Sequence, residues 1–107
     1  MTVQGTAGSA QEVDAVIDTG FSGFLTLPSA LVTVLGPAFD GVGWGVLVDG
    51  TETSFDMYGA TLLWDGEPRS VYVYAAETSP LVGMRLLDGH DLHIEVHEGG
   101  RVTVEAR

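Results

Sequence analysis

The sequence contains no cysteine, and this absence excludes several kinds of site at once. Without a thiol the chain can form neither a disulfide nor a thiolate nucleophile nor a cysteine-ligated zinc site. Apolar runs are also short, and none approaches the roughly 18 to 20 residues of a membrane-spanning helix. The first residues lack both the basic and the apolar stretch of a secretory signal. We therefore expect a cytoplasmic protein without a membrane partner.

Basic residues are scarce as well. The 4 lysines and arginines stand against 15 acidic residues, which gives a formal net charge of −11 at pH 7. A surface this acidic repels phosphate backbones and anionic lipid headgroups. Nucleic acid is therefore excluded as an expected partner.

The sequence is rich in apolar residues and in residues that form turns. Hydrophobic residues make up 45% of its 107 residues, enough for the core of one small domain. The 15 glycines and 4 prolines indicate many tight turns and therefore an all-β fold with one or two short helices. Residues 1–11 are small and polar, so we expect an N-terminal arm or edge strand there, followed by the domain proper over residues 12–107.

Hairpin signals run along most of the domain. Asp49-Gly50 and Asp65-Gly66 are dipeptides that favour tight turns between antiparallel strands. Pro28-Ser29 and Gly36-Pro37 are start and stop signals for one short helix. The alternating or apolar runs predict strands over residues 12–17, 24–27, 46–48, 51–58, 60–64, 70–74, 93–97 and 101–105, and a short strand passing into a helix over residues 81–87.

One polar triplet follows a buried strand. Asp18-Thr19-Gly20 comes directly after the apolar pair Val16-Ile17, which places a carboxylate at the exit of a core strand. A carboxylate in such a position is costly unless it is hydrogen-bonded or functional, and a glycine nearby lets backbone N–H groups approach it. The same triplet is also ordinary turn chemistry, so it does not by itself establish a site.

The surrounding sequence resembles the active-site stretch of retroviral-type aspartic proteases. Residues 15–28 (AVIDTGFSGFLTLP) are similar to the corresponding run in the small prokaryotic members of that clan. About sixty residues downstream, Leu81-Val82-Gly83 resembles the family's second landmark, two apolar residues and a glycine before a helix. Between them, residues 46–51 resemble the hairpin that forms the substrate-covering flap. The resemblance spans nearly the whole chain and implies a single-lobe barrel of hairpins.

This resemblance implies a dimeric peptidase. The chemistry needs two carboxylates that share one proton, because both cannot ionise when they are close together. The sequence holds a single Asp-Thr-Gly, so the expectation is a C2 homodimer in which Asp18 of each chain meets at the two-fold axis. One Asp18 would deprotonate the attacking water and the other would hydrogen-bond the scissile carbonyl oxygen. Neither a cofactor nor a metal is expected, and the partner would be a peptide or protein substrate.

The resemblance also assigns further roles. Thr19 would brace the two active-site loops across the dimer, while Gly20 belongs to the active-site loop and lies along the cleft. Two positions depart from the family: Phe21 stands where pepsin-like enzymes have a serine or threonine, and Arg85 stands where the family usually has Asn or Asp. The expected substrate-binding residues are Phe21, Ser22, Gly23, Asp49, Gly50, Leu81 and Val82.

Other interpretations stay open. His93, Glu95 and His97 would share one face of a strand and could bind zinc, although a solvated face opposite a buried one (Leu92, Ile94, Val96) is the simpler interpretation. Trp44 and Trp64 are expected to be core or flap-base aromatics.

Finally, a protease-like fold can serve as a peptide-binding or dimerisation module with negligible turnover, because a fold does not guarantee an activity.

Overall fold

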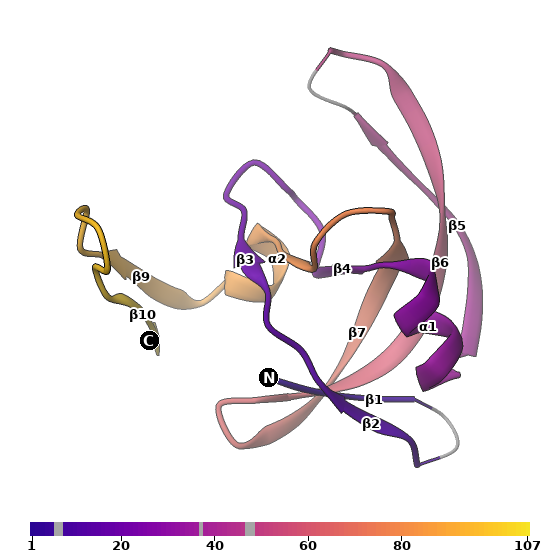
Figure 1. Ribbon diagram of the computed structural model, residues 1–107, viewed down its shortest axis with the longest axis horizontal. Coiled ribbons are helices and arrows are strands. Elements are labelled where there is room, and N and C mark those ends of the chain that lie inside the picture. The colour runs from indigo at the N-terminus through magenta and orange to yellow at the C-terminus, as the bar shows by residue number, and fades with distance from the viewer. Residues whose placement is uncertain (6–7, 37, 47–48) are drawn as a thin grey trace.

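A computed structural model describes residues 1–5, 8–36, 38–46 and 49–107. The chain is mainly β, with two short helices in this described part, α1 (Ser29–Leu35) and α2 (Met84–Leu87) (Figure 1). Its strands over the same residues are β1 (Thr2–Gln4), β2 (Ala10–Glu12), β3 (Val16–Ile17), β4 (Leu25–Leu27), β5 (Ala38–Val46), β6 (Glu52–Trp64), β7 (Glu67–Ala75), β8 (Leu81–Val82), β9 (His90–Ile94) and β10 (Val102–Ala106).

The main sheet curls into a half-barrel (Figure 1). Its strands follow the order β2-β1-β6-β7-β4-β8-β3, and β5 also pairs with β6. The N-terminal segment thus enters the sheet, with β1 between β2 and β6 and with β2 at an edge. None of the described helices is long and apolar enough to cross a bilayer.

The long strand β6 organises this curl. Its first part pairs with β5 as far as Gly59, and residues 61–63 pair with β1. The expected division into separate strands over residues 51–58 and 60–64 is wrong, because β7 pairs with β6 without a break from Met57 to Trp64 and keeps it continuous. The Asp65-Gly66 turn is confirmed, with φ of 54° and 80° at its two residues.

A short strand from far along the chain is inserted beside the Asp18 segment. β8 lies between β4 and β3, antiparallel to the former and parallel to the latter. The Leu81 N–H donates to Thr26 Oγ1 (3.0 Å). This bond gives the buried Thr26 hydroxyl a hydrogen-bond partner. This insertion brings the two segments singled out in the sequence into direct contact.

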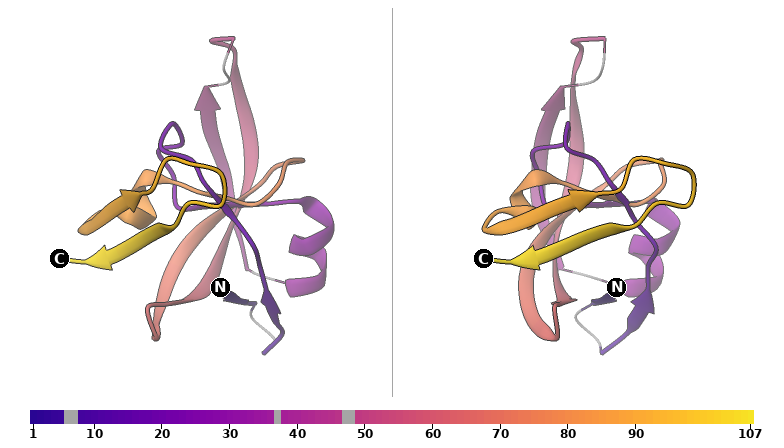
Figure 2. Two further views of the ribbon diagram at one scale, coloured as in Figure 1. Left: turned by 60° about the vertical axis from the view of Figure 1, so that its left-hand side comes forward. Right: turned by 90° about the vertical axis from the view of Figure 1, so that its left-hand side faces the viewer.

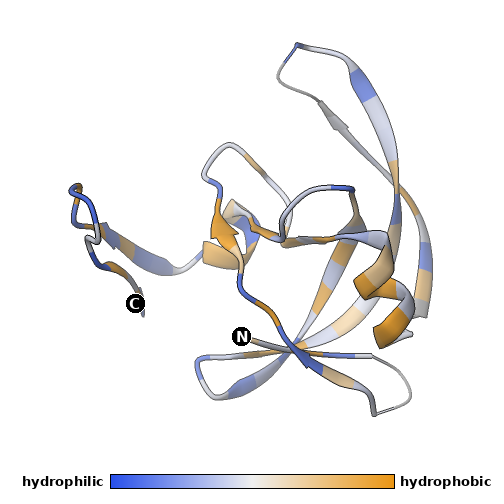
Figure 3. Ribbon diagram, in the orientation of Figure 1, coloured by the Kyte–Doolittle hydropathy of each residue, from blue (hydrophilic) through white to orange (hydrophobic). Residues whose placement is uncertain are grey.

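The core lies between the curled sheet and the two helices. Helix α1 has the expected limits, since Gly36 ends it at φ 59° with its N–H donating to the Val32 carbonyl; Pro37 lies outside the described residues. Figure 3 shows apolar residues gathered on β3, α1 and α2. The fully buried side chains of greatest volume are those of Leu25, Leu27, Leu35, Leu62, Leu86, Val3 and Val73.

The C-terminal hairpin stands apart from the main sheet. Strands β9 and β10 pair only with each other in the described residues, and the hairpin projects to one side in Figure 1 and comes toward the viewer in Figure 2. The expected buried face is wrong for Ile94 and Val96, whose exposed fractions are 50% and 91%. Val102, the cross-strand partner of Ile94, is 51% exposed. Leu92 and Val104 on these strands pack against the core, so the described part of the chain covers one end of the hairpin and leaves the end with Ile94 and Val102 exposed.

Candidate active site around Asp18

Asp18 begins the loop that joins β3 to β4. Its N–H donates to the Val82 carbonyl (2.9 Å), which continues the β3–β8 pairing by one residue, and its own carbonyl accepts from the Phe21 N–H (3.1 Å). The backbone of Asp18 is thereby held on both sides. A catalytic side chain needs such a fixed backbone, because small displacements of a reacting group are costly in rate.

The Asp18 carboxylate is half-buried and has a backbone partner. Its Oδ1 accepts the Gly20 N–H (2.9 Å). A Cβ at Gly20 would lie 3.2 Å from the same oxygen, closer than side chains normally approach. Glycine at this position therefore lets the amide reach the carboxylate without crowding it.

The segment from β8 into α2 supports this loop from behind. Three backbone N–H groups donate into it: Gly83 to Phe24 O (3.0 Å), Met84 to Phe21 O (2.8 Å) and Arg85 to Gly23 O (3.2 Å). A Cβ on Gly83 would overlap the Gly23 carbonyl oxygen and would lie 2.8 Å from that of Phe21. The glycine of Leu81-Val82-Gly83 is thus required by the close approach of two backbones.

A groove of about 970 Å³ opens beside Asp18. Its walls come from the 18–24 loop, the β5–β6 hairpin, strand β7, and the β8–α2 segment. The volume lies at the upper end of the range typical of ligand sites, roughly 300 to 1,000 Å³. The groove is therefore large enough for a segment of peptide, with a carboxylate on its surface.

Three aromatic rings form one wall of the groove. The rings of Phe55 and Tyr74 are stacked, with centroids 5.9 Å apart and an interplanar angle of 7°. Phe21 packs against Tyr74 at 6.0 Å and 59°. A Cβ at Gly43 or Gly45 would meet the Tyr74 or the Phe55 ring at about 3 Å, so these glycines let β5 lie close over the wall. The Phe21 ring, which stands where pepsin-like enzymes have a serine or threonine, is thus accommodated as part of an apolar surface.

Most of the residues expected at the site gather here. The side or backbone atoms of six of them line the groove: Asp18, Gly20, Phe21, Ser22, Gly23 and Leu81. Val82 is buried behind the loop, at 3% exposure, and Thr19 is exposed on the loop.

The other two expected residues, Asp49 and Gly50, lie in the turn of the β5–β6 hairpin. Residues 47–48, which belong to the same expected flap hairpin, lie outside the described residues. The Thr51 N–H donates to Asp49 Oδ1 (2.9 Å) and, since this favours the ionised form, lowers the pKa of Asp49. Gly50 has a φ of 86°, the left-handed conformation that glycine adopts without strain. Neither residue is among the described residues that line the groove.

Sequence reasoning missed much of the wall. Met57, Phe55, Tyr72 and Tyr74 alternate with the neighbouring residues of β6 and β7, and all of them line the groove. In β7 the buried valines at 71 and 73 show which face is covered, so Tyr72 and Tyr74, which alternate with them, had to lie on the other face. That alternation was the available signal. Trp44 also lines the groove, although 70% of it is exposed.

No cluster of three or more metal-ligating side chains occurs among the described residues. Strand β9 ends at Ile94, so Glu95 and His97 lie beyond the strand that holds His93. Trp64 is partly buried against the core and its Nε1–H donates to His90 Nε2 (2.9 Å), a contact between β6 and β9.

No protein-family model, curated protein or solved structure matches this chain. The site is therefore defined by its geometry alone: a carboxylate on a fixed loop, beside a groove with an aromatic wall.

Proposed function

We propose that this chain is one subunit of a homodimeric aspartic endopeptidase. The observation that carries the proposal is the position of the Asp18 carboxylate, half-buried on a backbone-held loop and facing a peptide-sized groove that the β5–β6 hairpin borders. The contact between this loop and Gly83 adds support, because the two segments that resemble the protease landmarks hold each other in place.

The chemistry requires a second carboxyl group, supplied by Asp18 of the partner subunit. The ionised Asp18 takes a proton from water, and the oxygen of that water bonds to the scissile carbonyl carbon. Asp18 of the partner subunit, protonated, gives its proton to the carbonyl oxygen and so stabilises the tetrahedral intermediate. The C–N bond then breaks as the first Asp18 returns its proton to the leaving nitrogen. The carboxyl of the partner subunit recovers its own proton as the new carboxylic acid forms.

The terminal hairpin is the surface we assign to the dimer. A two-stranded sheet is at best marginally stable in water, and β9–β10 has further strand edges and an exposed apolar face at Ile94, Val96 and Val102. Pairing or packing of two copies of the hairpin would cover this face. The site depends on that association, since a lone subunit has only half of the dyad.

The groove suits an extended apolar peptide. A peptide strand can pair with exposed backbone while its alternate side chains enter pockets, and here the stacked rings of Phe55 and Tyr74 offer an apolar pocket wall. We therefore expect large apolar side chains next to the scissile bond.

The test compares wild type with Asp18→Asn on an unfolded-protein substrate and a peptide library. Asp14→Asn is the matched control, because it removes the same charge from an exposed position four residues away. Cleavage should be lost in Asp18→Asn alone, with unchanged sedimentation, and a pepstatin-type inhibitor should raise the Tm of the wild type. Equal cleavage by the Asp18→Asn variant would overturn the proposal.

The second candidate is a peptide-binding or dimerisation module without turnover. The aromatic wall favours it, since an apolar groove holds a peptide strand whether or not a second carboxylate arrives. Peptide binding without cleavage, in a protein that sediments as a dimer, would identify this case.

A further inference from the structure

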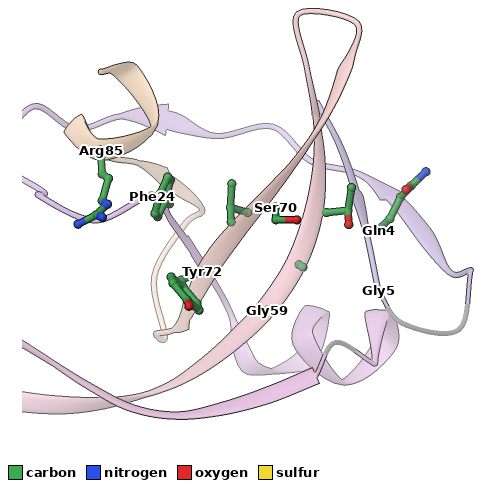
Figure 4. Close-up of a pocket in the computed structure, with 10 residues that line it drawn as sticks. Gln4, Gly5, Phe24, Gly59, Ser70, Tyr72 and Arg85 are labelled. Atoms are coloured by element: carbon green, nitrogen blue, oxygen red, sulfur yellow. The ribbon is translucent and has the colours of Figure 1, made fainter. Parts of the chain in front are cut away.

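A second hollow of about 450 Å³ adjoins the Asp18 groove. Phe24, Tyr72 and Arg85 line both, so the two form one continuous surface. Figure 4 shows these three side chains at one end of the hollow, with Gln4 and Gly5 at the other. A ligand in the Asp18 groove can therefore extend past Arg85 into this hollow.

Arg85 lies at the junction with its guanidinium over an aromatic ring. Its Cζ is 5.3 Å from the centroid of Phe24, and the Cζ of Arg69 is 5.5 Å from the same centroid. Arg69 also donates through Nη1 to the Leu86 carbonyl (3.0 Å). The ring attracts the Arg85 guanidinium, while the Arg85 backbone is held by its hydrogen bond to Gly23.

The charge of Arg85 is not neutralised within the described residues. Two ion pairs occur there, Met1–Glu12 and Arg107–Asp91, and neither involves Arg85. The carboxylates that line the same groove, Asp18 and Glu52, make no ion pair with it. Arg85 is the one basic residue among the described residues that line the groove, in a chain of net charge −11.

An exposed guanidinium that lies over an aromatic ring and has free N–H groups matches one chemical partner. Its fork of donors pairs with the two oxygens of a carboxylate, and the contact with the Phe24 ring lowers the side-chain freedom that such pairing would cost. Arg69, the other guanidinium over the Phe24 ring, makes no ion pair with the described residues either, but it lines neither the groove nor the hollow. A ligand there meets the one guanidinium of Arg85, which in an acidic protein fits a singly charged group better than a doubly charged phosphate.

We propose that Arg85 binds a carboxylate of the bound peptide, away from the scissile bond, and so selects substrates that are apolar at the centre and acidic toward one end. The inference rests on the proposed peptide groove. The carboxylate comes either from an acidic side chain or from the C-terminus of the peptide, and the two sources are separable by experiment.

The experiment measures binding to the Asp18→Asn protein, in which turnover does not interfere. The probes are fluorescein-labelled apolar peptides in which one glutamate is moved along the sequence, each matched by the same peptide with glutamine. At one position the glutamate peptide should bind about threefold to tenfold more tightly, and high salt should reduce this preference. Amidation of the C-terminus, tested in parallel, identifies the α-carboxylate as the source if it alone weakens binding.

Arg85→Gln should remove the preference. Arg85→Lys, which keeps the charge without the planar fork, should retain part of it. Arg101→Gln is the matched control: Arg101 lies exposed in the β9–β10 hairpin, and its backbone N–H rather than its side chain holds Glu95. Circular dichroism melts establish that each variant is folded. Equal affinity for glutamate and glutamine peptides at every position, with no effect of amidation, would overturn the inference, as would an undiminished preference in folded Arg85→Gln.

Cleavage by the wild type separates this inference from the proposed function. If the Asp18→Asn protein discriminates between the peptides but the wild type cuts none of them, the carboxylate site stands and the peptidase proposal falls. If the wild type cuts peptides without regard to their acidic residue, the peptidase stands and the role of Arg85 is wrong.

Discussion

Gly83 lies directly behind Gly23, so close that a Cβ on Gly83 would overlap the Gly23 carbonyl oxygen. The neighbouring hydrogen bond from Arg85 N–H to the same oxygen holds the two segments at this separation. The loop that carries Asp18 therefore owes its shape to a residue about sixty positions further along the chain.

Gly83→Ala should destabilise the fold by about 2 kcal/mol or more, because the added methyl group meets backbone that cannot rotate away. Ser22→Ala is the control, an exposed position in the same loop that should change the free energy of unfolding by less than about 0.5 kcal/mol. Chemical denaturation measures both. A Gly83→Ala protein as stable as the control would contradict this account of the contact.

Leu62→Ala should cost about 2 to 5 kcal/mol, whereas Leu63→Ala should cost far less. The two leucines are adjacent in β6, but Leu62 is fully buried and Leu63 is 37% exposed on the opposite face. Thermal and urea unfolding of the two variants give the comparison. A similar loss of stability in the two variants would mean that the half-barrel does not bury the face of β6 on which Leu62 lies.

Ile94→Lys and Val102→Lys should each shift the protein toward monomer, since a lysine on the apolar face of the terminal hairpin would place a charge in the proposed contact. Sedimentation velocity over a range of concentrations measures the change. The matched control is Val42→Lys on β5, which is similarly exposed (53%) and lies outside this hairpin. The same dimer dissociation constant in all three variants would show that the hairpin does not form the dimer interface.

Glu77→Gln should flatten the dependence of stability on acid pH. The Ser29 N–H donates to Glu77 Oε1 (3.2 Å), and the bonds from Ser29 lower the pKa of this carboxyl in the folded protein. Because the folded-state pKa lies below the unfolded one, the carboxylate stabilises the fold at neutral pH, and the contribution is lost as pH falls through the folded-state pKa.

Unfolding of wild type and Glu77→Gln at neutral and acid pH measures this effect. The stability difference between them should be largest near neutral pH and should shrink below the ordinary range of a glutamate carboxyl. Glu67→Gln, which changes an exposed glutamate at the start of β7, serves as the control. A difference between wild type and Glu77→Gln that grows on acidification would show the sign to be wrong.

Much of the fold is readable from local sequence. Asp65-Gly66 forms its turn because both residues take positive φ, and α1 ends where Gly36 adopts the left-handed conformation. The candidate site is readable in part: Asp18 and Gly20 line the groove as expected, although the strand before them is not the buried strand that the apolar pattern predicts, since Val16 is 57% exposed. Whether Asp18 meets a second copy of itself stays a prediction.

Other features depend on how the elements are packed. An alternating strand states which residues share a face, but not which face another element covers. The β9–β10 hairpin alternates as a half-buried strand pair would, yet Ile94 and Val102 remain open because no described element folds over them. The aromatic wall of Phe55 and Tyr74 likewise requires two strands of the half-barrel to lie side by side.

The sequence by itself determined the turns, the limits of α1, and an aspartate directly after a short strand, since these follow from the allowed φ angles and apolar pattern of a few neighbouring residues. Only the tertiary structure decided that Gly83 supports the Asp18 loop, that the aromatic rings face the groove, and that Arg85 keeps an unpaired charge beside it. These relationships join residues far apart in the chain, so they exist only once the sheet has curled and its distant strands have paired.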